Sequence, residues 1–114
     1  MANYLQTIDE LGGGQARILD DISYTNSTRI AIIISCQYDG SATAGLHIDV
    51  FYGPGVREYT TEPLLSQDLT FHAGEKVMEV VYVDCPKHGI LLPVITNLDG
   101  TYSVRNIRIW WEYA

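Results

Sequence analysis

The sequence predicts an all-β protein: a two-sheet antiparallel β-sandwich, jelly-roll-like, with a short N-terminal arm. From Ala16 onward, short runs of β-branched and aromatic residues alternate with turn residues. No stretch after that point keeps the 3.6-residue apolar period of a helix over a helix length. Seven or eight such runs in about 100 residues are typical of two sheets that share one core.

The chain of 114 residues, 46% of them hydrophobic, fits one domain with an N-terminal extension. Apolar residues at every third position predict a short helix over residues 4–11. Three successive glycines at 12–14 then predict a flexible break. We therefore expect residues 1–14 to form an N-terminal arm and residues 15–114 to form the β-sandwich domain.

Turn residues delimit the strands of this domain. Pairs such as Asp39-Gly40 and Asp99-Gly100 supply residues that adopt the positive or fixed φ of tight turns. The predicted strands cover residues 16–23, 28–38, 45–52, 56–61, 65–71, 76–84, 90–97 and 102–113. The strand at 56–61 has the weakest pattern of the eight.

The cysteines and tryptophans bear on the topology. An immunoglobulin domain places a Trp between its two cysteines, whereas Trp110 and Trp111 both follow Cys85. This departure favours a jelly-roll. Cys36 and Cys85 lie in strand-like runs, and the chain has enough apolar residues to fold without a disulfide bond. This favours free thiols; one disulfide bond between the two cysteines is the alternative.

Alternation along a strand assigns its two faces. The inward residues are expected to be Ile30, Ile32, Ile34, Cys36 and Tyr38 of one strand and Leu46, Ile48, Val50 and Tyr52 of the next. On the outward face of the second strand, His47 and Asp49 then lie beside the aromatic ring of Phe51.

Two strands leave apolar side chains on an outer face. In the run 76–84, Val77, Val81 and Val83 lie on one face, and Val80 and Tyr82 lie on the other. Both faces are therefore apolar and require cover. Adjacent tryptophans on a strand point to opposite sides, which leaves Trp110 on a polar face beside Arg108. A covering loop or arm, a subunit interface and a ligand platform each explain this pattern. We predict Val80, Tyr82, Trp110 and Arg108 as interface residues.

Charge and motifs exclude several functions. Lys plus Arg number 7 against 14 for Asp plus Glu, and a net charge of −7 repels nucleic acid. No apolar run approaches the roughly 18 to 20 residues of a membrane helix, so a soluble protein with no membrane partner is expected. No phosphate-binding loop, nucleophile elbow or metal-binding motif occurs. We predict no enzymatic activity, no cofactor and no metal site.

Weaker chemical alternatives remain. His47 and Asp49 project from one strand face as two metal ligands would, and His72 is the only plausible third ligand of a cupin-like enzyme. A Ser-His-Asp hydrolase built from His47 or His72 with Ser35 or Ser66 would lack the strained turn that activates a serine. Acidic Asp-Gly loops offer oxygen ligands to calcium, although the same dipeptide is a common hairpin turn.

Residues 38–106 resemble small β-sandwich proteins of bacteriophage and prophage structural modules. The segments that carry the resemblance are Asp39-Gly40-Ser41-Ala42-Thr43-Ala44-Gly45, Phe51-Tyr52-Gly53-Pro54-Gly55, Tyr59-Thr60-Thr61-Glu62-Pro63 and Asn97-Leu98-Asp99-Gly100 before Val104. The resemblance implies a capsid decoration, tail or fibre-associated subunit in the virion, usually a symmetric homo-oligomer that binds itself and other virion proteins. It transfers no site residues.

Two functional hypotheses follow. The first is a non-enzymatic structural or assembly protein of the phage virion type that acts through protein-protein contacts. The alternative is a carbohydrate-binding module or lectin-like domain. In the alternative, Trp110, Tyr59 and Phe51 stack on sugar rings, while Asp49 or Asp99 binds sugar hydroxyls.

Overall fold

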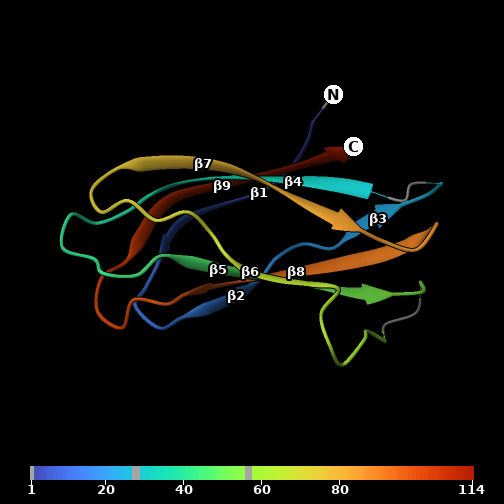
Figure 1. The fold of residues 1–114 in the computed structure, drawn as a ribbon, viewed down its shortest axis with the longest axis horizontal. Helices are drawn as coiled ribbons and strands as arrows, with labels where there is room; N and C mark the ends of the chain where they lie inside the picture. The colour runs from blue at the N-terminus through green and yellow to red at the C-terminus, as the bar shows by residue number, and fades with distance from the viewer. Residues whose placement is uncertain (1, 27–28, 56–57) are drawn as a thin grey trace.

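Two antiparallel sheets pack face to face in the computed structural model, which describes residues 2–26, 29–55 and 58–114 (Figure 1). One sheet has the strand order β1-β9-β4-β7, and the other has β2-β8-β5-β6 with β3 also paired to β8. The strands are β1 (Asn3–Leu11), β2 (Ala16–Ile18), β3 (Ile22–Tyr24), β4 (Arg29–Gln37), β5 (Leu46–Gly53), β6 (Leu65–Asp68), β7 (Lys76–Asp84), β8 (Gly89–Asn97) and β9 (Val104–Tyr113). The described residues contain no helix, so the predicted all-β sandwich is confirmed.

The core lies between the two sheets and follows the predicted alternation. On β4 and at the residue that follows it, the five expected inward residues are at most 3% exposed: Ile30, Ile32, Ile34, Cys36 and Tyr38. On β5, the fully buried residues are Leu46, Ile48 and Val50. Tyr52 is partly buried against the same cluster. Each central strand thus turns one face into the core, and the opposite face of its sheet lies outside the sandwich.

The helix predicted over residues 4–11 is wrong. These residues belong to β1, which pairs antiparallel with β9 at the edge of the four-stranded sheet and buries Ile8 and Leu11 in the core. The register shifts between Tyr4 and Gln6, which indicates a bulge that displaces the two-residue alternation. Ile8 and Leu11 lie opposite Ile107 and Val104 of β9, which are also buried three positions apart. The apolar spacing of three therefore comes from an irregular strand pair. An isolated helix of this length is marginal, whereas β9 satisfies the strand's backbone groups.

Pro93 explains why the predicted strand 16–23 is two strands. β2 and β3 pair with opposite halves of β8, on either side of Pro93. The carbonyl of Pro93 accepts a hydrogen bond from the Leu19 amide at 2.9 Å. Proline has no N–H to donate in return, so the ladder is interrupted at this point.

The strand predicted at 56–61 is not formed at residues 58–61, and residues 56–57 lie outside the described residues. The Thr60 amide and hydroxyl both bond to the backbone of Tyr52, at 2.8 and 3.3 Å, as a loop contact. The predicted strand 65–71 is shorter, ending at Asp68 in β6. The remaining predicted strands are present with ends that differ by one or two residues.

Two further features bear on earlier expectations. Cys36 is a buried free thiol, and Cys85 is a free thiol of intermediate exposure. Within the ranges that the structure describes, no helix is long and apolar enough to span a membrane.

Candidate functional site

The outer face of the four-stranded sheet brings the predicted interface residues together. Trp110 on β9 lies between Tyr4 on β1 and Ile33 on β4, and Ile33 in turn pairs with Val80 on β7. In the next row, Ala31 separates Glu112 from Tyr82. We call six side chains of this face the apolar band: Tyr4, Ile33, Met78, Val80, Tyr82 and Trp110.

Exposure within the apolar band is highest on its two edge strands. Tyr4 is 62% exposed on β1, and Met78, Val80 and Tyr82 are 64%, 43% and 50% exposed on β7. Trp110 is half-buried because it has a neighbour on each side in the sheet. The N-terminal strand therefore lies beside Trp110 and does not cover it. A contiguous exposed apolar surface of this kind is typical of a binding surface.

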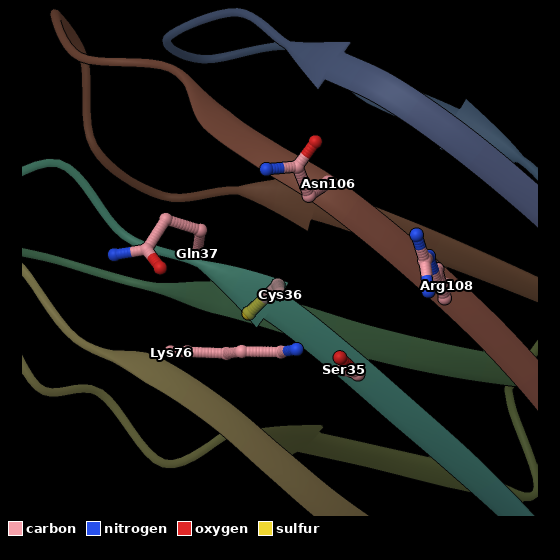
Figure 2. Close-up of a pocket in the computed structure, with 6 residues that line it drawn as sticks. All are labelled: Ser35, Cys36, Gln37, Lys76, Asn106 and Arg108. Carbon is pink, nitrogen blue, oxygen red and sulfur yellow. The ribbon is translucent and has the colours of Figure 1, made fainter.

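A hollow of about 200 Å³ adjoins the apolar band on the same face. Figure 2 shows Lys76 reaching from β7 toward β4, with Asn106 and Arg108 standing on β9 at the other side of that strand. We call this cavity the polar hollow, and its lining residues are Ser35, Cys36, Gln37, Lys76, Asn106 and Arg108. Arg108 is two residues from Trp110 on β9, so the polar hollow and the apolar band are continuous.

A β-bulge in β9 forms one wall of the polar hollow. Ser35 pairs with Arg108 and Gln37 with Arg105, so two residues of β9 oppose Cys36 alone. The additional residue is Asn106, whose φ of 52° lies in the left-handed region. Asparagine tolerates this conformation better than most side chains, and a bulge bends its strand and re-aims the neighbouring side chains. The local sequence therefore places an amide at the rim of the hollow.

The electrostatics of the polar hollow are set by two cations. Arg29 lies 3.6 Å from Asp84, and Arg105 lies 3.4 Å from Glu10. Within the described ranges, Lys76 and Arg108 have no ion-pair partner. The polar hollow therefore carries positive charge in a protein whose net charge is −7.

Cys36 is also among the lining residues of the polar hollow, although its side chain belongs to the buried core. Burial raises its pKa to about 11, with a hydrogen bond from Tyr38 opposing the shift. The thiol is therefore protonated at neutral pH and is a poor nucleophile. It therefore offers the hollow no reactive group.

The residues of the predicted carbohydrate site do not come together in one place. Trp110 lies on the outer face of the four-stranded sheet, whereas Phe51 and Asp49 lie on the outward face of β5 in the other sheet. Tyr59 belongs to the β5–β6 connection, with its ring close to Gly53. Of the five predicted residues, Trp110 alone belongs to the face described above.

Asp99, the fifth of these residues, holds a loop together. Its residue is 6% exposed, and its carboxylate accepts hydrogen bonds from the amides of Thr43, Thr101 and Tyr102 at 2.8 to 2.9 Å. These backbone donors, that of Tyr102 first, hold the pKa of the carboxyl well below its usual range. Its oxygens are therefore engaged within the protein, and we do not include Asp99 in the candidate site.

A second polar cluster surrounds His47 on the outward face of β5. Its Nδ1 lies 2.6 Å from Asp68, and its Nε2 lies 3.0 Å from Ser66 and 3.2 Å from Asp49. The hydrogen bond to Asp68, followed by that to Asp49, raises the pKa of the imidazole against the effect of burial. Ser66 lies in the regular strand β6 without the sharp turn that activates a serine nucleophile.

The same cluster bears on the metal alternative. The two carboxylates approach opposite nitrogens of the His47 ring, so the three groups do not converge on one point. In the part of the chain that the structure describes, no three His, Cys, Asp or Glu side chains form a group that could hold a metal ion. His72 does not join His47 and Asp49 in any such group.

Four residues of the polar hollow were missed by the sequence analysis as binding residues: Ser35, Gln37, Lys76 and Asn106. One signal was available for Asn106. The inward residues Val104 and Ile107 are three positions apart, where a regular strand requires two or four, and this irregularity indicates a bulge. Lys76 has no comparable signal, because its place beside β4 depends on the strand order.

Comparison with solved structures shows the same fold in functionally different proteins. The C-terminal family 6 carbohydrate-binding module of a laminarinase from Zobellia galactanivorans matches 96% of this chain and 90% of its own, with a TM-score of 0.53 and 14% identity. A carbohydrate-binding module of Cellvibrio mixtus lichenase 5A, in complex with cellotriose, matches 96% and 88%, with a TM-score of 0.53 and 10% identity. A chain of infectious bursal disease virus, Gx strain, matches over 96% of this chain and 29% of its own, with a TM-score of 0.52 and 13% identity.

These comparisons place the protein in a broad structural class and no narrower. At 10 to 14% identity they show the fold, a jelly-roll-like β-sandwich. No protein-family model and no curated protein sequence matches the chain. The resemblance to bacteriophage structural modules therefore gains no support at family level; the coarser likeness is to carbohydrate-binding modules and to a viral protein.

Proposed function

We propose that the protein binds carbohydrate on the outer face of the four-stranded sheet and catalyses no reaction. The observation that carries this proposal is the continuity of exposed aromatic side chains with the polar hollow on one face. Sugar binding requires both features, since the apolar face of a pyranose stacks on an aromatic ring while its hydroxyl groups need directional polar partners.

The aromatic side chains are spaced across the sheet. Tyr4 and Trp110 are direct cross-strand neighbours, and Tyr82 lies on the far edge strand. The guanidinium of Arg29 lies 4.5 Å above the Tyr82 ring, which holds that ring in place. The aromatic surface is thus supported by the sheet, as a stacking platform should be.

The similar structures support this proposal over an assembly role at the level of fold. Two of the three structures described above are carbohydrate-binding modules, and one of them holds cellotriose. Similarity at such low identity does not transfer the roles of individual residues, so the ligand-binding face is inferred from the surface of this chain alone. That surface retains Trp110 from the predicted carbohydrate site and replaces its other four members with residues of the apolar band and the polar hollow.

Replacement of Trp110 tests the proposal. In a glycan array followed by titration calorimetry, Trp110→Ala should weaken binding of any glycan retained by the unmodified protein at least tenfold, because a stacked ring contributes about 1 kcal/mol or more beyond its buried area. Phe51→Leu, on the outer face of the other sheet, is the matched control and should bind normally. Absence of binding across neutral and acidic glycans would contradict the proposal.

Self-association through the same face is a second candidate, favoured by Met78 and Val80. These aliphatic side chains are exposed on the edge strand β7, where stacking on sugar does not require them. A symmetric pair of such faces would bury them. Light scattering on the unmodified protein and on the Val80→Lys variant gives the molar mass of each in solution. A dimer that the substitution dissociates supports this candidate, and a monomer in both samples excludes it.

A further inference from the structure

The basic residues of this acidic protein are concentrated on one sheet. Four of the seven Lys and Arg residues lie on strands of the four-stranded sheet: Arg29, Lys76, Arg105 and Arg108. Two of them have carboxylate partners, Asp84 for Arg29 and Glu10 for Arg105. The two without ion-pair partners in the described residues are the two that line the polar hollow.

Their position relative to the hollow is specific. Lys76 comes from β7 and Arg108 from β9, the strands on either side of β4, so the two charges flank the hollow from opposite sides (Figure 2). Both ends of the hollow therefore favour a negative group between them. Arg108 offers a planar fork that bonds two oxygens of a carboxylate or sulfate, and Lys76 adds a compact charge.

We infer that the carbohydrate bound on this face is acidic, with a carboxylate or sulfate group held in the polar hollow between Lys76 and Arg108. The inference rests on the proposed function and names its ligand class. With the anion in the hollow, the sugar ring that bears it lies against Trp110, about 7 Å further along β9. A volume of about 200 Å³ is below the roughly 300 Å³ at which drug-sized pockets begin, so it suits one charged group and not a whole oligosaccharide.

Titration calorimetry with four defined probes tests the inference. The probes are cellotriose, trigalacturonic acid, a sulfated galactotriose and inorganic sulfate, each measured at low and high sodium chloride. We expect at least one acidic trisaccharide to bind about tenfold more tightly than cellotriose, since a hydrogen bond to a charged group is worth roughly this factor. High salt should weaken the acidic ligand and leave the neutral one unchanged.

Charge-removing variants locate the effect. Lys76→Gln and Arg108→Gln should each lower affinity for the acidic trisaccharide about tenfold. Lys87→Gln and Arg17→Gln remove the same charges elsewhere, from the β7–β8 connection and from β2 of the other sheet, and should bind normally. Thermal unfolding of each variant verifies that the fold is retained.

The outcomes separate the two proposals. Equal affinity for neutral and acidic trisaccharides, unaffected by Lys76→Gln and Arg108→Gln, would overturn the acidic ligand and leave carbohydrate binding intact. Silence with all three trisaccharides would overturn both. Inorganic sulfate bound as tightly as the sulfated sugar, with no effect of Trp110→Ala, would show an anion site without sugar recognition. Preference for trigalacturonic acid or for the sulfated sugar supports the inference and identifies the charged group.

Discussion

At the scale of single residues, Asn97 connects three segments at one end of the sandwich. Its fully buried amide donates to the carbonyls of Leu11, Gly12 and Tyr102, and its carbonyl accepts from the Asp99 amide. Asp99 then binds the loop before β5 through Thr43. The end of β1 and the β8–β9 connection are therefore held by one polar network, in which every member has a partner.

Asn97→Ala should lower the free energy of unfolding by about 2–4 kcal/mol, because buried carbonyls lose their donor and a cavity replaces the amide. Chemical denaturation followed by tryptophan fluorescence measures this loss. The exposed residue Asn3 on β1 provides the control, since Asn3→Ala should change stability by less than about 0.5 kcal/mol. Equal effects of the two substitutions would contradict the role assigned to Asn97.

His47 makes a pH-dependent contribution. Its folded pKa is raised above the ordinary 6.5, chiefly by the Asp68 hydrogen bond, so the stabilisation is complete below about pH 6.5 and is lost as pH rises through the folded pKa. Asp68→Asn should therefore destabilise the protein more at pH 5.5 than at pH 9, by less than about 1 kcal/mol because Asp68 is largely exposed.

Denaturation at the two pH values measures this difference. Asp84→Asn removes a carboxylate that faces the permanently charged Arg29, and its effect should be the same at both values. A larger loss for Asp68→Asn at pH 9 than at pH 5.5 would reverse the assigned sign.

At the scale of single elements, β9 determines the shape of the binding face. Its bulge at Asn106 moves Arg108 and Trp110 onto the outer face while Ile107 and Ile109 stay buried. If β9 ran as a regular strand through Asn106, Val104 and Ile107 would point to opposite faces of the sheet. The same strand therefore contributes to the core, the polar hollow and the apolar band.

Asn106→Val should cost about 1–2 kcal/mol of stability, because a β-branched residue is poorly tolerated at a φ of 52°. Asn106→Gly should be stable or more stable, since glycine adopts this conformation freely. Thermal unfolding compares the two variants, and a valine variant as stable as the glycine variant would show that the bulge is not retained in solution.

The elements differ in how far the sequence could predict them. β5 and β7 alternate regularly, so their bounds and inward faces follow from a period of two; in β4 the same period gives the inward face, although Ala31 and Ser35 of the opposite face are buried as well. β1 and the strand pair β2 and β3 could not be predicted in the same way. In β1 the helix-like spacing reflects irregularities of the strand pair that β1 forms with β9, and the break between β2 and β3 depends on a proline in another strand.

At the scale of the whole molecule, the sequence predicts a sandwich and leaves open the order of its strands. The interface residues Val80, Tyr82, Trp110 and Arg108 share one face because β4 lies between β7 and β9. The predicted sugar-binding residues are scattered because β5 belongs to the other sheet. Outward orientation can be predicted locally, whereas the face on which a residue lies is a property of the topology. The division of the chain at residue 14 and the predicted lack of enzymatic activity stay predictions.

The most direct test of the account is an NMR titration of isotope-labelled protein with an acidic trisaccharide that it binds. We expect shifts of the Trp110 indole N–H and of amides in β4, β7 and β9, with the outward face of β5 unchanged. Saturation should occur at one ligand per chain. Shifts centred on Phe51 and Asp49, with Trp110 unaffected, would place the binding face on the other sheet and contradict the account.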